Sequence, residues 1–255
     1  MSHSSLATLL RQRLAAVEER LGRACQRAGR PRSSVTLVAV TKSISVEIAR
    51  LLPELGVRDL GENRPQELWR KAAALPRDVR WHLIGHWQRN KIERTLPLVY
   101  LCHSADSIRL LDALEQAADR QGRTVPVLLE VNASREPAKH GFAPEEVPPL
   151  VPRLNELRRV VIRGLMTMAA YEEDPERCRR TFRELRELRD ALRARLAPLH
   201  RLDELSMGMT NDFEVAIEEG ATMVRIGTAL FGGLPAPGEG PASPGGSQDG
   251  LAGLA

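Results

Sequence analysis

The sequence predicts a single (β/α)₈ barrel, the TIM-barrel architecture, with a helix in front of it. Eight short apolar segments alternate with helical patterns along the chain, which is typical of parallel βαβ units. The chain has 255 residues, about the length of one such barrel. An open doubly wound sheet would show the same alternation, but eight units with short crossovers in this length favour the closed barrel.

The elements follow one another at an even pitch. An amphipathic helix at 6–29 comes first, and Gly29 and Pro31 end its pattern. The predicted strands are 35–40, 57–61, 81–85, 98–102, 125–131, 161–166, 202–207 and 223–230. Helical patterns lie near 46–54, 65–74, 88–95, 107–121, 144–157, 175–197 and 211–219. We expect one domain at 1–233 and a disordered tail at 234–255, which is rich in Pro, Gly and Ser.

The charge pattern does not indicate a nucleic-acid partner. The net charge is +4, but aromatic residues make up only 4% of the chain, too few for base-stacking platforms. The arginine-rich segment 175–197 has one apolar face, and it places Arg180–Glu184 and Arg183–Glu187 at ion-pair spacing. A solvated outer helix explains this segment.

The location of the protein is predicted from what the sequence lacks. No apolar run approaches the ~18 residues of a membrane span, and residues 1–10 do not resemble a signal peptide. The three cysteines form no CxxC pair, which argues against a cysteine zinc site and fits a reducing compartment. We therefore expect a cytoplasmic protein with no membrane partner.

In these barrels the working residues follow the C-terminal ends of the strands. Lys42 closes the first apolar strand, and an apolar wall behind it would favour the uncharged amine that condenses with an aldehyde. A solvated lysine, or one paired with a carboxylate, fits equally well. Near the last strand, Gly227 and Thr228 suit a phosphate. Arg225 would point to the same side, with a barrel-lining salt bridge as the alternative reading.

The segment 205–212 (LSMGMTND) has two readings that are compatible. It forms a second wall of the phosphate site with Ser206, or it caps the next helix through Thr210 or Asn211.

Two other sites are excluded by spacing. His82 and His86 lie four residues apart near a strand, roughly 13 Å when extended, so they cannot share a metal. The adjacent positions of His103, Ser104 and Asp106 do not suit a hydrolase triad, which is assembled from distant segments. We predict no metal site.

Several motifs, in order, resemble the pyridoxal phosphate homeostasis protein family (the YggS/PROSC group), which is related to the N-terminal barrel of alanine racemase. They are VAVTK (38–42), GENRPQE (61–67), WHLIGHWQRNK (81–91), NASREPAKHG (132–141), RGLMTM (163–168), LSMGMTND (205–212) and TMVRIGTALFG (222–232). The resemblance covers about residues 6–232.

The resemblance implies a cofactor, pyridoxal 5′-phosphate (PLP), held as a Schiff base on Lys42. It implies that Arg225 faces the pyridine nitrogen and that Asn63 lies near the ring. The phosphate cradle would consist of Ser206, Gly227 and Thr228, with Met207 alongside. The chain departs from the family at Ser43-Ile44, where another lysine often follows, at Leu60 and at Gly233. The missing lysine bears on the route of cofactor transfer.

The implied function is intracellular PLP homeostasis and delivery, without catalysis, by a monomer whose partners include PLP-dependent enzymes that lack their cofactor. The alternative is a weak PLP-dependent amino-acid racemase or lyase. Racemisation needs a base on each face of the cofactor, and in this chain Tyr171 is the residue that could stand opposite Lys42.

Overall fold

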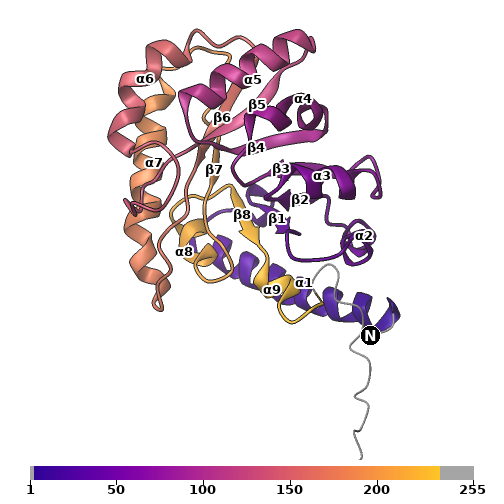
Figure 1. Ribbon diagram of the computed structural model, residues 1–255. Helices are drawn as coiled ribbons and strands as arrows, with labels where there is room; N and C mark the ends of the chain where they lie inside the picture. Colours follow the sequence, from indigo (N-terminus) through magenta and orange to yellow (C-terminus); the bar gives the residue numbers. More distant parts are fainter. Residues whose placement is uncertain (1–2, 236–255) are drawn as a thin grey trace, which may run out of the picture.

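The computed structural model describes residues 3–235 and confirms the barrel (Figure 1). The strands pair in sequence order, all parallel, and β1 pairs with β8 to close the sheet. Their bounds are β1 (Thr36–Val40), β2 (Asp59–Glu62), β3 (Arg80–Leu83), β4 (Val99–Ala105), β5 (Val125–Glu130), β6 (Val160–Met166), β7 (Glu204–Ser206) and β8 (Met223–Ile226).

Helices follow the strands and cover the outside of the barrel (Figure 1). They are α1 (His3–Arg27), α2 (Val46–Glu54), α3 (Pro65–Ala72), α4 (Ile92–Thr95), α5 (Ile108–Arg120), α6 (Val147–Leu154), α7 (Arg179–Arg193), α8 (Phe213–Glu218) and α9 (Thr228–Phe231). Short 3₁₀ turns are η1 (Arg32–Ser34), η2 (Arg89–Lys91), η3 (Leu96–Leu98), η4 (Pro144–Glu146) and η5 (Pro175–Cys178).

The last predicted strand, 223–230, is too long. The strand ends at Ile226, and the chain turns at Gly227 into the short helix α9. The carbonyl of Gly227 accepts hydrogen bonds from the amides of Leu230 and Phe231. These helical bonds replace strand pairing, so the loop that leaves β8 lies at the mouth of the barrel.

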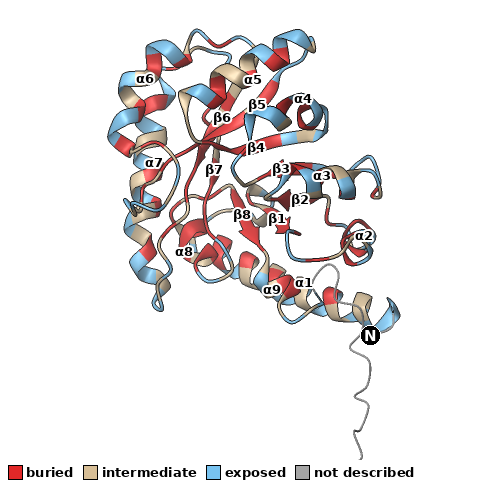
Figure 2. Cartoon of the chain, in the orientation of Figure 1, coloured by how far each residue is buried: buried red, intermediate tan, exposed pale blue. Residues whose placement is uncertain are grey.

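Side chains alternate between two apolar regions. The main core lies between strands and helices, so the inner faces of the helices are buried and their outer faces exposed (Figure 2). A small second cluster consists of Leu101, Leu128, Met166 and Met223, which lie on alternate positions of their strands and face the lumen. Buried polar side chains, including His103 of β4 and Arg225 of β8, also face the lumen, and the site is built on them.

The N-terminal helix α1 packs against α8 and α9 (Figure 1). Its buried face includes Leu10, Val17 and Leu21. Ion pairs join the same elements, with 2.8 Å between Arg20 Nε and Glu214 Oε1 and 2.7 Å between Arg27 Nε and Glu218 Oε1. The two ends of the described chain therefore lie side by side.

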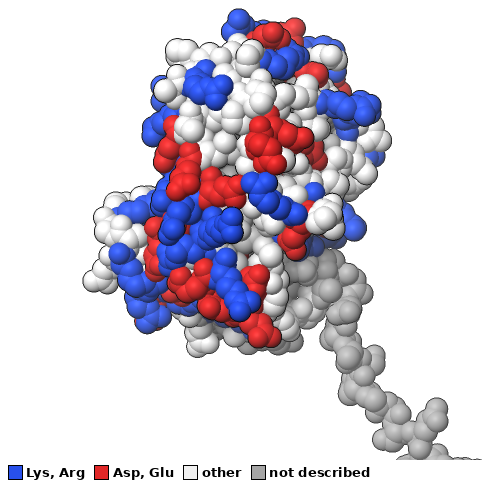
Figure 3. All heavy atoms as spheres, turned by 90° about the vertical axis from the view of Figure 1, so that its left-hand side faces the viewer, with Lys and Arg blue, Asp and Glu red and all other residues white. Residues whose placement is uncertain are grey.

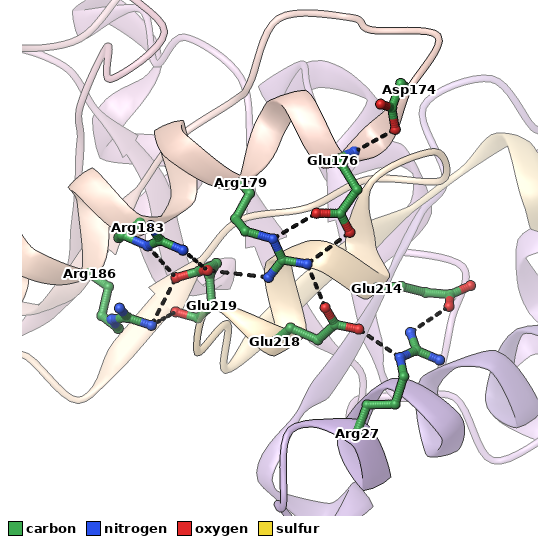
Figure 4. Close-up of polar contacts among 9 residues, drawn as sticks. All are labelled: Arg27, Asp174, Glu176, Arg179, Arg183, Arg186, Glu214, Glu218 and Glu219. Atoms are coloured by element: carbon green, nitrogen blue, oxygen red, sulfur yellow. Dashed lines mark hydrogen bonds and ion pairs between the residues drawn. The ribbon is translucent and has the colours of Figure 1, made fainter.

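The arginines of α7 do not form the predicted pairs within the helix. Arg183 pairs at 3.0 Å with Glu219, the C-cap residue of α8, and Glu184 pairs with Arg135 at 2.6 Å. Glu219 is nearly buried and also pairs with Arg179 and Arg186 (Figure 4). A carboxylate with little access to water offers a stronger partner than exposed acids one turn away. Basic and acidic side chains are interleaved on this side of the molecule (Figure 3).

Three further expectations concern the chain as a whole. Leu234 packs against the core, and the expected tail from residue 236 onward lies outside the described residues. Within 3–235, no helix has both the length and the apolarity to cross a membrane. The three cysteines are buried and form no disulfide.

Candidate functional site

A cavity of about 680 Å³ lies at the C-terminal ends of the strands, where the sequence predicts the site. Four of the seven predicted site residues line it: Lys42, Arg225, Gly227 and Thr228. The closure of the barrel brings them together, because β1 pairs with β8 in a register that sets Val38 beside Arg225. The volume falls in the range of small-molecule sites, ~300–1,000 Å³.

Lys42 follows β1 and is exposed at this cavity. The expected apolar wall therefore does not desolvate it. None of the described residues accepts a hydrogen bond from its amine or pairs with it, so the carboxylate-paired alternative is also wrong. A primary amine without a partner at a cavity wall is free to act as a nucleophile.

The other three lysines of the chain are engaged. Lys71 is buried in an ion pair with Glu62. Lys139 lines the same cavity, but its amine donates to the main-chain carbonyls of Met168 and Ala169 at 3.1 and 2.9 Å. Lys91 lies over the ring of Trp69. Lys42 is thus the lysine that the fold leaves available.

Arg225 is buried at the floor of the cavity with 4% exposure. Its Nη1 donates to the hydroxyl of Ser206 at 2.5 Å and its Nη2 to the carbonyl of Thr167 at 2.9 Å. Within residues 3–235 no carboxylate lies in ion-pair contact with it, so the salt-bridge alternative is wrong. Burial lowers the pKa of Arg225 to about 10, which leaves the guanidinium charged at neutral pH.

The phosphate-binding loops predicted from the sequence meet at one side of the cavity. Gly227 precedes α9 and lies against Val40 of β1, where an added Cβ would come within 3.4 Å of Val40 Cβ. The hydroxyl of Thr210 accepts a hydrogen bond from the amide of Ala229 at 3.2 Å, which ties the β7–α8 loop to the β8–α9 loop. Neither Thr210 nor Asn211 caps α8; the N-cap residue is Asp212.

Three predicted residues take other places. Asn63 lines a neighbouring pocket of about 340 Å³ that shares Lys42 with the main cavity. Ser206 and Met207 are fully buried and do not line either pocket. The Ser206 hydroxyl contacts Arg225 and His103, and Met207 packs in the outer core. The side-chain positions therefore do not support direct contact of either residue with a ligand.

Two acidic residues near Arg225 were not predicted. Burial and the Asp106 carboxylate raise the pKa of Glu130 to about 7, against the opposite effect of Arg225 and His86. Burial also raises the pKa of Asp212, which lines the cavity. Glu130 could have been found from the sequence, because it is a glutamate at the end of an otherwise apolar strand. Asp212 could not, because its position depends on how the loop folds.

His82 and His86 belong to separate hydrogen-bond networks. His82 is buried and bonded to Asp59 and His103, whereas His86 is half exposed and bonded to Asp106 at 2.8 Å. In the part of the chain that the structure describes, no group of three or more His, Cys, Asp or Glu residues is arranged to hold a metal ion.

The fold and the cavity define a class, the barrels that carry a lysine after the first strand and an arginine on the last. In comparison with known proteins, the family model "Alanine racemase, N-terminal domain" matches residues 12–235. The chain is 44% identical over 222 residues to the pyridoxal phosphate homeostasis protein of Aquifex aeolicus, covering 87% of this chain and 96% of the relative. It is 38% identical to that of Pseudomonas aeruginosa, covering 87% and 94%.

The chain belongs to the pyridoxal phosphate homeostasis protein family. A solved structure also matches it, that of PipY from Synechococcus elongatus with PLP bound, at 35% identity and a TM-score of 0.75. The match covers 88% of this chain and 100% of PipY. The family named from sequence motifs is thereby confirmed.

Proposed function

We propose that this chain binds PLP in the 680 Å³ cavity and holds it through a Schiff base on Lys42. The observation that carries the proposal is the free amine of Lys42, since every other lysine is engaged elsewhere. PLP supplies an aldehyde that condenses with a primary amine. The PLP-bound structure of the related PipY supports the choice of ligand.

The remaining parts of the cofactor find partners of matching chemistry. Arg225 faces the pyridine nitrogen as a pure donor, and because it holds its protons at neutral pH the nitrogen stays unprotonated. This weakens the ring as an electron sink. The phosphate lies at Gly227 and Thr228, where loop amides and hydroxyls suit an anion. Thr210 adds a hydroxyl there, in place of Ser206. Asn63 lines the adjoining pocket, from which it would border the ring.

The proposed role is homeostasis and delivery of the cofactor in the cytoplasm by a monomer, without catalysis. The naming of the relatives supports the homeostasis role. The exposure of Lys42 supports release, because the covalent bond to be broken lies at the solvent side of the cavity. PLP-dependent enzymes without their cofactor are the proposed recipients.

An absorbance spectrum of the protein mixed with PLP tests the Schiff base. We expect a visible band in the wild type and in Lys139→Ala, and its loss in Lys42→Ala. Lys139 is the matched control because it lines the same cavity but its amine is already bonded. Borohydride reduction and peptide mapping should place the label on Lys42. A band that survives in Lys42→Ala, or a label on Lys139 or Lys91, would contradict the proposal.

A further inference from the structure

A line of buried polar side chains crosses the barrel lumen beneath the cavity, and ligand binding as proposed does not use it. Asp59, His82, His103 and Ser206 come from β2, β3, β4 and β7 and are at most 7% exposed. Buried polar groups cost free energy unless they are hydrogen-bonded. Hydrogen bonds among these four side chains therefore make their burial in the lumen tolerable.

Each member of the line contacts the next. The distances are 3.0 Å from Asp59 Oδ1 to His82 Nε2, 2.8 Å from His82 Nδ1 to His103 Nε2, and 2.8 Å from His103 Nδ1 to Ser206 Oγ. The line ends on Arg225, whose Nη1 lies 2.5 Å from Ser206 Oγ. At the opposite end, Arg80 pairs with Asp59 near the exposed ring of Tyr100. We call these residues, from Asp59 to Arg225, the lumen relay.

The two ends of the lumen relay fix the direction of its hydrogen bonds. Arg225 can only donate. Burial alone would raise the pKa of Asp59, but hydrogen bonds from His82 and Arg80 leave it below its ordinary value, so the ionised carboxylate only accepts. With both histidines neutral, one arrangement satisfies every group. Arg225 donates to Ser206, Ser206 to His103, His103 to His82, and His82 to Asp59, with the proton on Nε2 of each ring.

The opposite direction is less favourable. It requires a charged His82 that donates from both ring nitrogens, and it leaves the hydroxyl proton of Ser206 without an acceptor among the described residues. Desolvation, with His82 and Arg225 as further causes, holds the pKa of His103 well below its ordinary value, which agrees with a neutral ring at that position.

We propose that Asp59, His82 and His103 are positioning residues for Arg225, acting through Ser206. The relay polarises the Ser206 hydroxyl, so that its oxygen becomes a stronger acceptor and holds the guanidinium in place. Arg225 gains the influence of the distant Asp59 carboxylate without direct neutralisation by an acid. The N–H groups of Arg225 that face the cavity therefore keep their full positive charge. The consequence for PLP rests on the function proposed above, whereas the direction of the relay does not.

The direction is tested on the full chain without cofactor, by long-range proton–nitrogen NMR of isotopically labelled histidine. We expect neutral rings with the proton on Nε2 at both His82 and His103. A proton on Nδ1 of His103, or a charged His82 ring at neutral pH, would overturn the relay.

The effect on the cofactor site is tested by PLP titration of His103→Phe and Asp59→Asn. We expect His103→Phe to weaken PLP binding by roughly tenfold, as for one hydrogen bond to a charged group, and to shift the visible band. Asp59→Asn should also weaken PLP binding and shift the visible band, but by less than His103→Phe does. If His103→Phe does not fold, Asp59→Asn tests the positioning role. Wild-type affinity and spectrum in the variant that folds would overturn the positioning role.

His200→Phe is the matched control. His200 is also a buried histidine, but within residues 3–235 its ring hydrogen-bonds only to the carbonyl of Leu154 and the amide of Ile162. It should lose stability and retain PLP affinity, and an equal loss of affinity there would overturn the specific role of the relay. If the wild type itself fails to bind PLP, the proposed function is wrong, and the NMR result still decides the direction of the relay.

Discussion

Lys71 donates a 2.6 Å hydrogen bond to the main-chain carbonyl of Thr41, the residue immediately before Lys42. The same amine pairs with Glu62 at 2.6 Å, and neither side chain of this pair is exposed. The Thr41 hydroxyl donates to the same oxygen of Glu62. A buried ion pair thus holds the backbone that presents Lys42 to the cavity.

Lys71→Met should strongly destabilise the protein, because it leaves the Glu62 carboxylate buried without a cation. We expect the free energy of unfolding to fall by about 3–5 kcal/mol, measured by urea denaturation. Adding Glu62→Gln should restore part of the loss. Lys91→Met, which removes an amine over Trp69, is the control and should cost less than 1 kcal/mol, as is ordinary for surface changes. Equal effects of the two lysine variants would contradict the structural role of Lys71.

Glu130 should make the stability of the barrel depend on pH near neutrality. Its pKa is raised to about 7 by burial and by Asp106, whereas an unfolded glutamate titrates near 4.3. Between these values the folded state binds more protons, so this group lowers the free energy of unfolding as pH rises. Glu130→Gln should remove that decline.

The measurement is the stability difference between Glu130→Gln and the wild type at pH 5 and pH 8. It should move in favour of the variant by on the order of 2 kcal/mol at the higher pH. Histidines that titrate in this range contribute to both proteins and cancel. A difference that does not change with pH would contradict the prediction.

Glu219 should be the most sensitive position of the network in Figure 4, because one nearly buried carboxylate holds three arginines of α7. Burial raises the pKa of Glu219, but hydrogen bonds from Arg183 and Arg179 outweigh this and lower it overall. Its contribution is therefore complete at neutral pH and is lost as pH falls through its lowered pKa.

Glu219→Gln should lower the free energy of unfolding at pH 7 by on the order of 2 kcal/mol, and the loss should disappear in acid. Glu187→Gln, an acid on the outer side of α7 with no ion pair in the described structure, is the control. A loss that persists unchanged at pH 3 would show that the carboxylate charge is not responsible.

We expect no useful racemisation of amino acids. A racemase needs a second base opposite Lys42, and Tyr171, although it lines the cavity, is 84% exposed and has no hydrogen-bond partner in the described residues to hold it. Deuterium exchange at the α-carbon of L-alanine in heavy water should not exceed that with free PLP. Rapid exchange abolished by Tyr171→Phe would identify an enzyme.

The order of the barrel was predictable from sequence because each apolar strand is followed by its own helical pattern. The helix at 46–54 was predicted with its observed bounds. The end of β8 was not predictable, since the segment Thr228–Phe231 (TALF) suits a strand or a helix. Hydrogen bonds to the Gly227 carbonyl make it a helix. The arginine pairs of α7 depend on α8, which lies about 35 residues away along the chain and is invisible to i,i+4 spacing.

The candidate site was predictable where a residue follows the end of a strand, as at Lys42 and Thr228. It was not predictable where the register of the barrel decides which side chain faces inward. Ser206, the last residue of β7, points into the lumen, whereas the next residue, Met207, packs in the outer core. Only the folded barrel shows that His103 lies 2.8 Å from Ser206.

The packing of α1 on α8 and α9 has a consequence for folding during synthesis. The buried face of α1 is synthesised long before its partners, which begin only at Phe213. One edge of β1 likewise stays unpaired until β8 has been synthesised. The nascent chain therefore exposes an apolar helix and an unpaired strand edge until the last unit emerges, a state prone to aggregation. Closure of the ring is the long-range step that should limit the rate of folding.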